Sequence, residues 1–83
     1  GIVMVYGGQF VNAMYSASAG SQTVGVSGIP YLRSLPDFSP YPKYGHGIGM
    51  SQWGAQELAR QGWTYRQILA YYYPGVSFAR LPG

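Results

Sequence analysis

Strand-like apolar runs open the chain. Residues 1–6 (GIVMVY) are rich in β-branched side chains, and Gly7 and Gly8 separate them from a second run at residues 9–18. Two such runs around a Gly-Gly pair predict a β-hairpin with a primed turn, because glycine adopts the positive φ angles that this turn requires. Neither face of the second run is cleanly polar, which indicates that the hairpin is covered on both sides or lies against another chain.

The middle of the chain has no helical period. Residues 17–28 are small, polar and glycine-rich, which is typical of a loop. Residues 29–37 (IPYLRSLPD) are bracketed by Pro30 and Pro36, which favour an extended or edge-strand conformation because proline lacks a backbone N–H. Residues 38–44 (FSPYPKY) contain two more prolines and are expected to cross the surface.

Two short helices are expected to close the chain. The first begins after an N-cap at Ser51, ends at Arg60 or Gln61, and is followed by Gly62 in the C′ position. Its apolar positions, which are expected to be buried, are Trp53, Ala55, Leu58 and Ala59.

The second helix has the stronger local signature. Thr64 and Gln67 are spaced as a capping box, and Pro74 and Gly75 end the apolar pattern. Its buried stripe is predicted to be Ile68, Leu69 and Tyr72. Together these patterns predict an α+β fold, a small antiparallel β-sheet of a hairpin and extended segments packed on two short C-terminal helices. Residues 1–83 are expected to form one partial domain, with a β-rich part at 1–44 and the helical part at 45–83.

Composition limits what this fold can do. A chain of 83 residues buries roughly 60% of its unfolded surface and is marginally stable unless a disulfide, a metal or a partner helps. There is no cysteine, and one histidine with only Asp37 and Glu57 argues against a structural zinc site, so we expect no metal and no cofactor. A second protein chain is the expected helper. Charged residues are only 8% of the chain, and nine tyrosines suit half-wet surfaces such as interfaces and sugar-binding clefts.

The formal charge of +3 is scattered along the sequence. Without a basic run, nucleic acid is not an expected partner, whereas a mild attraction to anionic cell-wall polymers fits. No apolar run reaches 18 residues, so no membrane span is predicted. The chain begins at Gly1 without an initiator Met, and we expect it to be processed or cut from a longer protein.

The most unusual stretch is residues 45–55 (GHGIGMSQWGA), called the glycine block below. It places the single histidine, His46, among four glycines just before the first predicted helix. Glycine lets a second backbone or a ligand approach closely. A tight strand-to-helix turn with a merely packed histidine is an equally weighted interpretation.

The run GHGIGMSQWGAQELARQGWTYRQILAYYYPG resembles the C-terminal signature of the stage II sporulation protein D and amidase-enhancer (SpoIID/LytB) family. Upstream, FVNAMYSASAGSQT and IPYLRSLPD resemble the family's strand with a Ser- and Gly-rich turn and its Pro-Tyr-Leu-Lys/Arg-Ser segment. The resemblance implies a bacterial, extracytoplasmic protein whose partner is peptidoglycan, acting as a lytic transglycosylase on glycan strands or as an enhancer of cell-wall amidases.

Three departures from the family pattern matter. The family's catalytic glutamate lies in an upstream helical segment that this chain lacks, so the chain alone is not expected to be an active transglycosylase. The positions that match the zinc-binding His and Cys of some members are Tyr15 and Ser18, which again predicts no zinc. The link at residues 38–44 is shorter than the family's, so part of the usual sheet is expected to be missing.

Five side chains are candidates for contacting glycan or orienting an acid. His46 can donate or accept a hydrogen bond near neutral pH, and Gln52 offers both functions to sugar hydroxyls or N-acetyl groups. Ser51 has a hydroxyl, but an N-cap uses it on the helix backbone, where free amides could still bind an oxygen. Tyr15 and Ser16 are expected to line the same cleft. Trp53 and Trp63 are expected in the core rather than as sugar platforms.

Three functions remain open at this point. The leading one is a SpoIID-like domain for peptidoglycan glycan strands that is inactive unless a second chain supplies the acid. The alternative is a non-catalytic structural subunit of an extracytoplasmic assembly, and the third is a free-standing peptidoglycan-binding module. A glutamate-bearing helical segment in the same gene or in a tightly bound chain would distinguish the first two.

Overall fold

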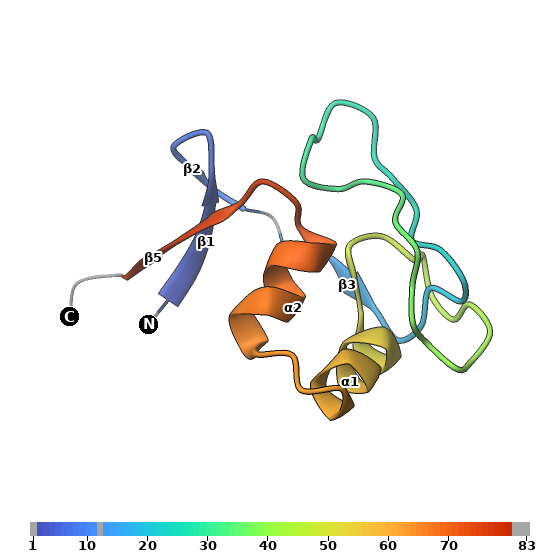
Figure 1. Ribbon diagram of the computed structural model, residues 1–83. Coiled ribbons are helices and arrows are strands. Elements are labelled where there is room, and N and C mark those ends of the chain that lie inside the picture. The colour runs from blue at the N-terminus through green and yellow to red at the C-terminus, as the bar shows by residue number, and fades with distance from the viewer. Residues whose placement is uncertain (1, 12, 81–83) are drawn as a thin grey trace.

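The computed structural model describes residues 2–11 and 13–80, and in this part of the chain it confirms the predicted α+β fold (Figure 1). The helix α2 lies between a small antiparallel sheet on one side and the helix α1 with a long loop on the other. The elements in chain order are β1 (Ile2–Tyr6), β2 (Gln9–Phe10), β3 (Tyr15–Ser16), β4 (Met50–Ser51), α1 (Gln52–Arg60), α2 (Tyr65–Tyr72) and β5 (Ser77–Arg80).

The N-terminal hairpin forms where the sequence predicts it. Gly7 and Gly8 have φ angles of 58° and 81°, the two positive values of a type I′ turn, and β1 pairs antiparallel with β2. The predicted length of the second strand is wrong, because β2 ends at Phe10. Residues of β3 leave this sheet and pair in parallel with β4 instead, with Tyr15 opposite Met50 and Ser16 opposite Ser51.

A further strand follows the helices, so the expectation that two helices close the chain is wrong. β5 pairs antiparallel with β1 and gives the sheet order β2-β1-β5. Gly75 has a φ of 84° and reverses the chain directly after α2. A Cβ at Gly75 would lie 2.9 Å from the Tyr6 ring, so the turn passes close against the end of β1.

Both helices begin and end as predicted. The Ser51 hydroxyl accepts a hydrogen bond from the Gly54 amide at 3.1 Å, which caps α1. Thr64 and Gln67 form the reciprocal capping box of α2. Gly62 follows α1 with a φ of 94°, as a C′ glycine does.

The core joins the two helices to one residue of the long loop. Its buried members are Leu32, Leu58, Ile68, Leu69, Tyr72 and Tyr73. The predicted stripe of α2 is therefore confirmed. On α1 only Leu58 of the expected apolar positions is fully buried; Ala59 is exposed and the Trp53 side chain is 40% exposed, so their placement in the core is wrong. A nine-residue helix packed on one side buries only part of its apolar residues.

The long loop between β3 and β4 is held by side chains and isolated bridges rather than by strands. Thr23 is buried, and its hydroxyl donates to the Arg33 carbonyl and accepts from the Leu35 amide, each at 2.8 Å. An isolated antiparallel bridge joins Gln22 to Pro36. These bonds accompany an extended course at residues 33–37. The predicted extended conformation is wrong at the start of the segment, where the Leu32 amide donates to the Ile29 carbonyl at 3.0 Å in a turn. Within residues 2–11 and 13–80, no helix is long and apolar enough to cross a membrane.

Candidate functional site

The glycine block forms the turn that leads into α1. Gly45, Gly47 and Gly49 have φ angles of 98°, 73° and 73°, which side chains with a Cβ rarely adopt. The Val24 amide donates to the Gly47 carbonyl at 2.8 Å, so the block lies against the long loop. The turn is therefore a fixed backbone shape that alternates glycines with His46, Ile48 and Met50.

Gly49 lets the glycine block pass close to Met14, the residue that precedes β3. An added Cβ would lie 2.0 Å from the Met14 carbonyl oxygen, which is well inside contact distance. That oxygen accepts from the Met50 amide at 3.1 Å and from the Tyr73 hydroxyl. The Tyr73 hydroxyl also accepts from the Met50 amide, at 3.3 Å. The buried Tyr73 side chain, directly after α2, thus contacts both β4 and the residue that precedes β3.

Gly54 has an equivalent role on α1. A Cβ there would lie 2.0 Å from Asp37 Oδ1 and 2.2 Å from the Tyr72 hydroxyl oxygen. Tyr72 donates to Asp37 Oδ1 at 2.7 Å, and Tyr71 donates to the Pro36 carbonyl. The helix can lie over this hydrogen bond only because residue 54 has no side chain.

His46 is exposed at the tip of the turn. Its Nδ1 accepts a hydrogen bond from the Ile48 amide at 2.9 Å. Because Nδ1 accepts, the neutral ring carries its proton on Nε2. The imidazole is thus held by its own turn and presents an N–H donor at the surface.

Ser51 and Gln52 differ sharply in accessibility. Ser51 is 0% exposed, and its hydroxyl accepts from the Gly54 amide and, at 3.4 Å, from the Ala19 amide. Its interpretation as an N-cap is confirmed, and its hydroxyl is not available at the surface. Gln52 is exposed in the first turn of α1, so of the two it alone presents its side chain to a ligand.

Tyr15 and Ser16 do not share a face, because adjacent residues of a strand point to opposite sides. Tyr15 is 58% exposed, whereas Ser16 is buried. The Ser16 hydroxyl has no hydrogen-bond partner among the described residues and lies close to Gly45, whose added Cβ would be 3.2 Å from the Ser16 Cβ. Of this pair only Tyr15 is accessible to a ligand.

Comparison with known proteins gives partial matches. The chain is 59% identical over 34 residues to the amidase enhancer of Bacillus subtilis (strain 168), which covers 41% of this chain and 5% of that protein. It is 47% identical over 36 residues to stage II sporulation protein D of the same strain, covering 43% of this chain and 10% of that protein. Stage II sporulation protein D of Bacillus amyloliquefaciens gives the same identity and coverage.

The predicted resemblance to the C-terminal part of SpoIID/LytB proteins is confirmed. The matched stretch spans only 5% to 10% of the length of these bacterial relatives. No family model matches the chain, and no solved structure matches it.

The two carboxylates of this SpoIID/LytB-like chain are both engaged by other side chains. Asp37 Oδ1 accepts from Tyr72, and Asp37 Oδ2 is buried without a partner among the described residues. Glu57 lies on α1, 3.8 Å from the Arg60 guanidinium. Neither carboxylate lies in the glycine block, so neither is brought beside His46 by the local chain.

The two positions matched to the zinc ligands of some SpoIID/LytB members lie in different surroundings. Tyr15 is exposed, whereas Ser18 is buried and its hydroxyl lies 2.6 Å from the Ser39 hydroxyl oxygen. Among the described residues no three His, Cys, Asp or Glu side chains are grouped as metal ligands.

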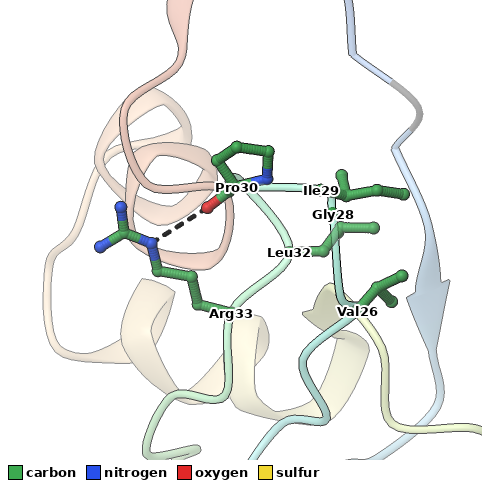
Figure 2. A pocket seen from close by; sticks show the side chains of 6 residues that line it. All are labelled: Val26, Gly28, Ile29, Pro30, Leu32 and Arg33. Atoms are coloured by element: carbon green, nitrogen blue, oxygen red, sulfur yellow. Dashed lines mark hydrogen bonds between the residues drawn. The ribbon is translucent and has the colours of Figure 1, made fainter.

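Sequence reasoning passed over Arg33 of the IPYLRSLPD segment. Figure 2 shows a hollow at the tip of the long loop, with Arg33 beside Pro30 at its rim. The Arg33 Nε donates to the Pro30 carbonyl at 3.0 Å, which orients the exposed guanidinium. The hollow has a volume of about 290 Å³, and Val26, Ile29 and Leu32 also line it. The sequence did not indicate this arrangement, because the loop's conformation brings Arg33 next to the apolar residues.

Alkaline pH is expected to destabilise the chain through Tyr72. Burial, and then the hydrogen bond to Asp37, raise the pKa of Tyr72 well above its ordinary value. The unfolded chain loses this proton first, so the stabilisation is complete below pH 10 and falls as the pH rises further, by up to about 1.4 kcal/mol per unit. Urea unfolding between pH 8 and 11 measures this slope. Tyr72→Phe should reduce the slope, and an unchanged slope would contradict the assignment.

Proposed function

We propose that this chain is part of an extracytoplasmic bacterial domain that binds and helps to process the glycan strands of peptidoglycan. The observation that carries the proposal is the match to an amidase enhancer and to stage II sporulation protein D. The exposed His46, presented by a rigid turn within the glycine block, supports it from the geometry.

The residues have distinct roles in this proposal. His46 donates from Nε2 to a hydroxyl or acetamido oxygen of the glycan, and Gln52 offers a donor and an acceptor from the first turn of α1. Tyr15 adds an aromatic surface from β3. Arg33 attracts the carboxylates of the muramoyl residues, because the guanidinium is exposed and permanently charged. Ser51 and Ser16 support the fold of the site without touching the ligand.

Cleavage of the glycan needs a carboxylic acid that stays protonated until it reaches the glycosidic oxygen. Asp37 is hydrogen-bonded within the fold and Glu57 faces a guanidinium on α1, so neither has this role. We therefore assign the acid to a segment outside these 83 residues, in the same protein or in a second chain.

Binding to stem-peptide-free glycan strands tests the proposal. Cosedimentation of the chain with sacculi stripped by an amidase should give saturable binding. His46→Ala should raise the Kd about tenfold, which corresponds to about 1.4 kcal/mol for one lost hydrogen bond. Tyr65→Ala, which removes an exposed ring beside the hairpin, is the matched control and should bind as the wild type does. Absence of wild-type binding would refute the function.

A structural role in an assembly is the second candidate, and one surface favours it. Between α2 and the hairpin lies an apolar hollow of about 470 Å³, and Phe10 and Tyr65 at its edge are 73% and 74% exposed. Exposed apolar patches of this kind mark contacts with other proteins. A second chain seated here, with no glycan affinity, would support the structural alternative.

A further inference from the structure

A second pair of exposed aromatic rings lies where the long loop meets the first turn of α1, next to Gln52. Trp53 and Tyr41 are 40% and 50% exposed, and their ring centroids are 4.8 Å apart at an interplanar angle of 66°. Two rings inclined in this way form a corner with an open side. The corner borders a small hollow of about 50 Å³ lined by Pro40, Tyr41, Trp53, Gln56, Glu57 and Arg60.

The corner is held in place before any ligand arrives. The Trp53 amide donates to the Ala17 carbonyl at 3.0 Å, which ties the first turn of α1 to the end of β3. The buried Ser18 hydroxyl donates to the Tyr41 carbonyl at 3.1 Å, and the Tyr41 amide donates to the Ser39 hydroxyl at 3.2 Å. The backbones of both aromatic residues are therefore hydrogen-bonded to residues 17–18. A ligand then has to order less of the chain than it would at a flexible site, so less entropy is lost on binding.

The polar rim comes from the same face of α1 as Trp53. Residues three, four and seven positions after Trp53 share its face, and these are Gln56, Glu57 and Arg60. Gln56 supplies both a hydrogen-bond donor and an acceptor. In the Glu57–Arg60 pair, whose charged groups are 3.8 Å apart, the carboxylate accepts and the guanidinium donates. Ligand sites combine an aromatic wall with a few polar groups in this way.

The aromatic wall and the small hollow limit what can bind here. Aromatic faces carry partial negative charge and attract the weakly positive C–H face of a sugar ring. A volume of about 50 Å³ holds a few water-sized groups, which is enough for one substituent of a sugar and too little for the ring. The amide of an acetamido group can donate and accept at the same rim.

We propose that Trp53 and Tyr41 form an accessory subsite for an N-acetylated amino sugar, with the ring on Trp53 and the acetamido group in the hollow. The subsite rests on the proposed glycan-binding function and extends it. Trp53 directly follows Gln52, so the subsite continues the glycan surface along the first turn of α1.

A titration followed by NMR tests the subsite. The probes are a soluble β-1,4-linked N-acetylglucosamine hexamer and cellohexaose, which lacks the acetamido groups. The Trp53 indole N–H and the Gln56 side-chain amide should shift with the first probe, while the Trp63 indole stays in place. Trp53→Ala should raise the Kd about tenfold, a loss of about 1.4 kcal/mol. Gln56→Ala, an exposed change that leaves the fold intact, should weaken binding as well.

The outcomes separate the subsite from the function on which it rests. If the wild type binds stripped glycan strands and Trp53→Ala and Gln56→Ala bind them equally well, the subsite is overturned and the function stands. If cellohexaose binds as tightly as the N-acetylated hexamer, the acetamido assignment is overturned. If the wild type binds neither strands nor hexamer, both proposals are overturned.

Discussion

Gly49→Ala is expected to destabilise the chain by about 2–5 kcal/mol. The left-handed φ of 73° costs a residue with a Cβ about 1–2 kcal/mol, and forcing an atom into a packed site costs about 1–3 kcal/mol more. The new Cβ would meet the Met14 carbonyl oxygen at 2.0 Å, and a backbone atom cannot move aside as a flexible side chain can. Small domains have a total stability of only about 5–15 kcal/mol, so the loss is a large fraction.

Thermal and urea unfolding followed by circular dichroism measures this loss. A change of 1 kcal/mol shifts the Tm of a domain of this size by about 4–8 °C, so the Tm should fall by at least about 8 °C. Gly28→Ala is the matched control, because Gly28 has a φ of 83° but nothing within 4 Å of the added Cβ. It should lose only about 1–2 kcal/mol. Equal losses in the two variants would show that packing against Met14 is not the cause.

Gly54→Ala is expected to destabilise the chain even though it lies in a helix. Helix propensity alone predicts a gain of about 1 kcal/mol, since alanine is the better helix former. The added Cβ would instead displace the Tyr72–Asp37 hydrogen bond, whose atoms lie 2.0 Å and 2.2 Å from it. A hydrogen bond to a charged group contributes about 1.5–3 kcal/mol, and overpacking costs about 1–3 kcal/mol. The net expectation is a loss of about 1.5–5 kcal/mol.

A double-mutant cycle with Tyr72→Phe separates these contributions. Removing the hydroxyl takes away one of the two clashing atoms and frees Asp37 to shift. The double variant should therefore be more stable than the sum of the two single losses predicts, measured by urea unfolding. A stabilised Gly54→Ala variant, or strict additivity, would contradict the proposed packing.

The contacts of these glycines also explain why the glycine block contains so many of them. Gly49 and Gly54 make room for Met14, Asp37 and Tyr72, which come from three separate parts of the sequence. The tyrosines at the end of α2 donate to the same two segments. The glycines at 49 and 54 therefore serve close packing, and His46, Gln52 and Trp53 are the exposed side chains of the same block.

The sequence by itself determined the elements whose causes lie within a few residues. The capping box of α2 and the Ser51 cap of α1 are contacts between residues three apart, so spacing alone reveals them. The type I′ turn follows from Gly7 and Gly8 in the same way. The family resemblance likewise rested on contiguous motifs.

The tertiary structure alone decided what depends on residues far apart. β3 pairs with β4, some thirty-five residues away, instead of extending the hairpin. β5 pairs with β1, which lies at the other end of the chain. Trp53 is apolar, yet it stays 40% exposed with the Tyr41 ring packed edge-on against it. The entropy cost of closing such a loop depends on its length rather than on a short local sequence, so no short pattern predicts these pairs. The candidate residues lie on elements that these pairs position. Spacing therefore identified Ser51 as an N-cap but did not separate the buried Ser16 from the exposed His46, Gln52 and Tyr15.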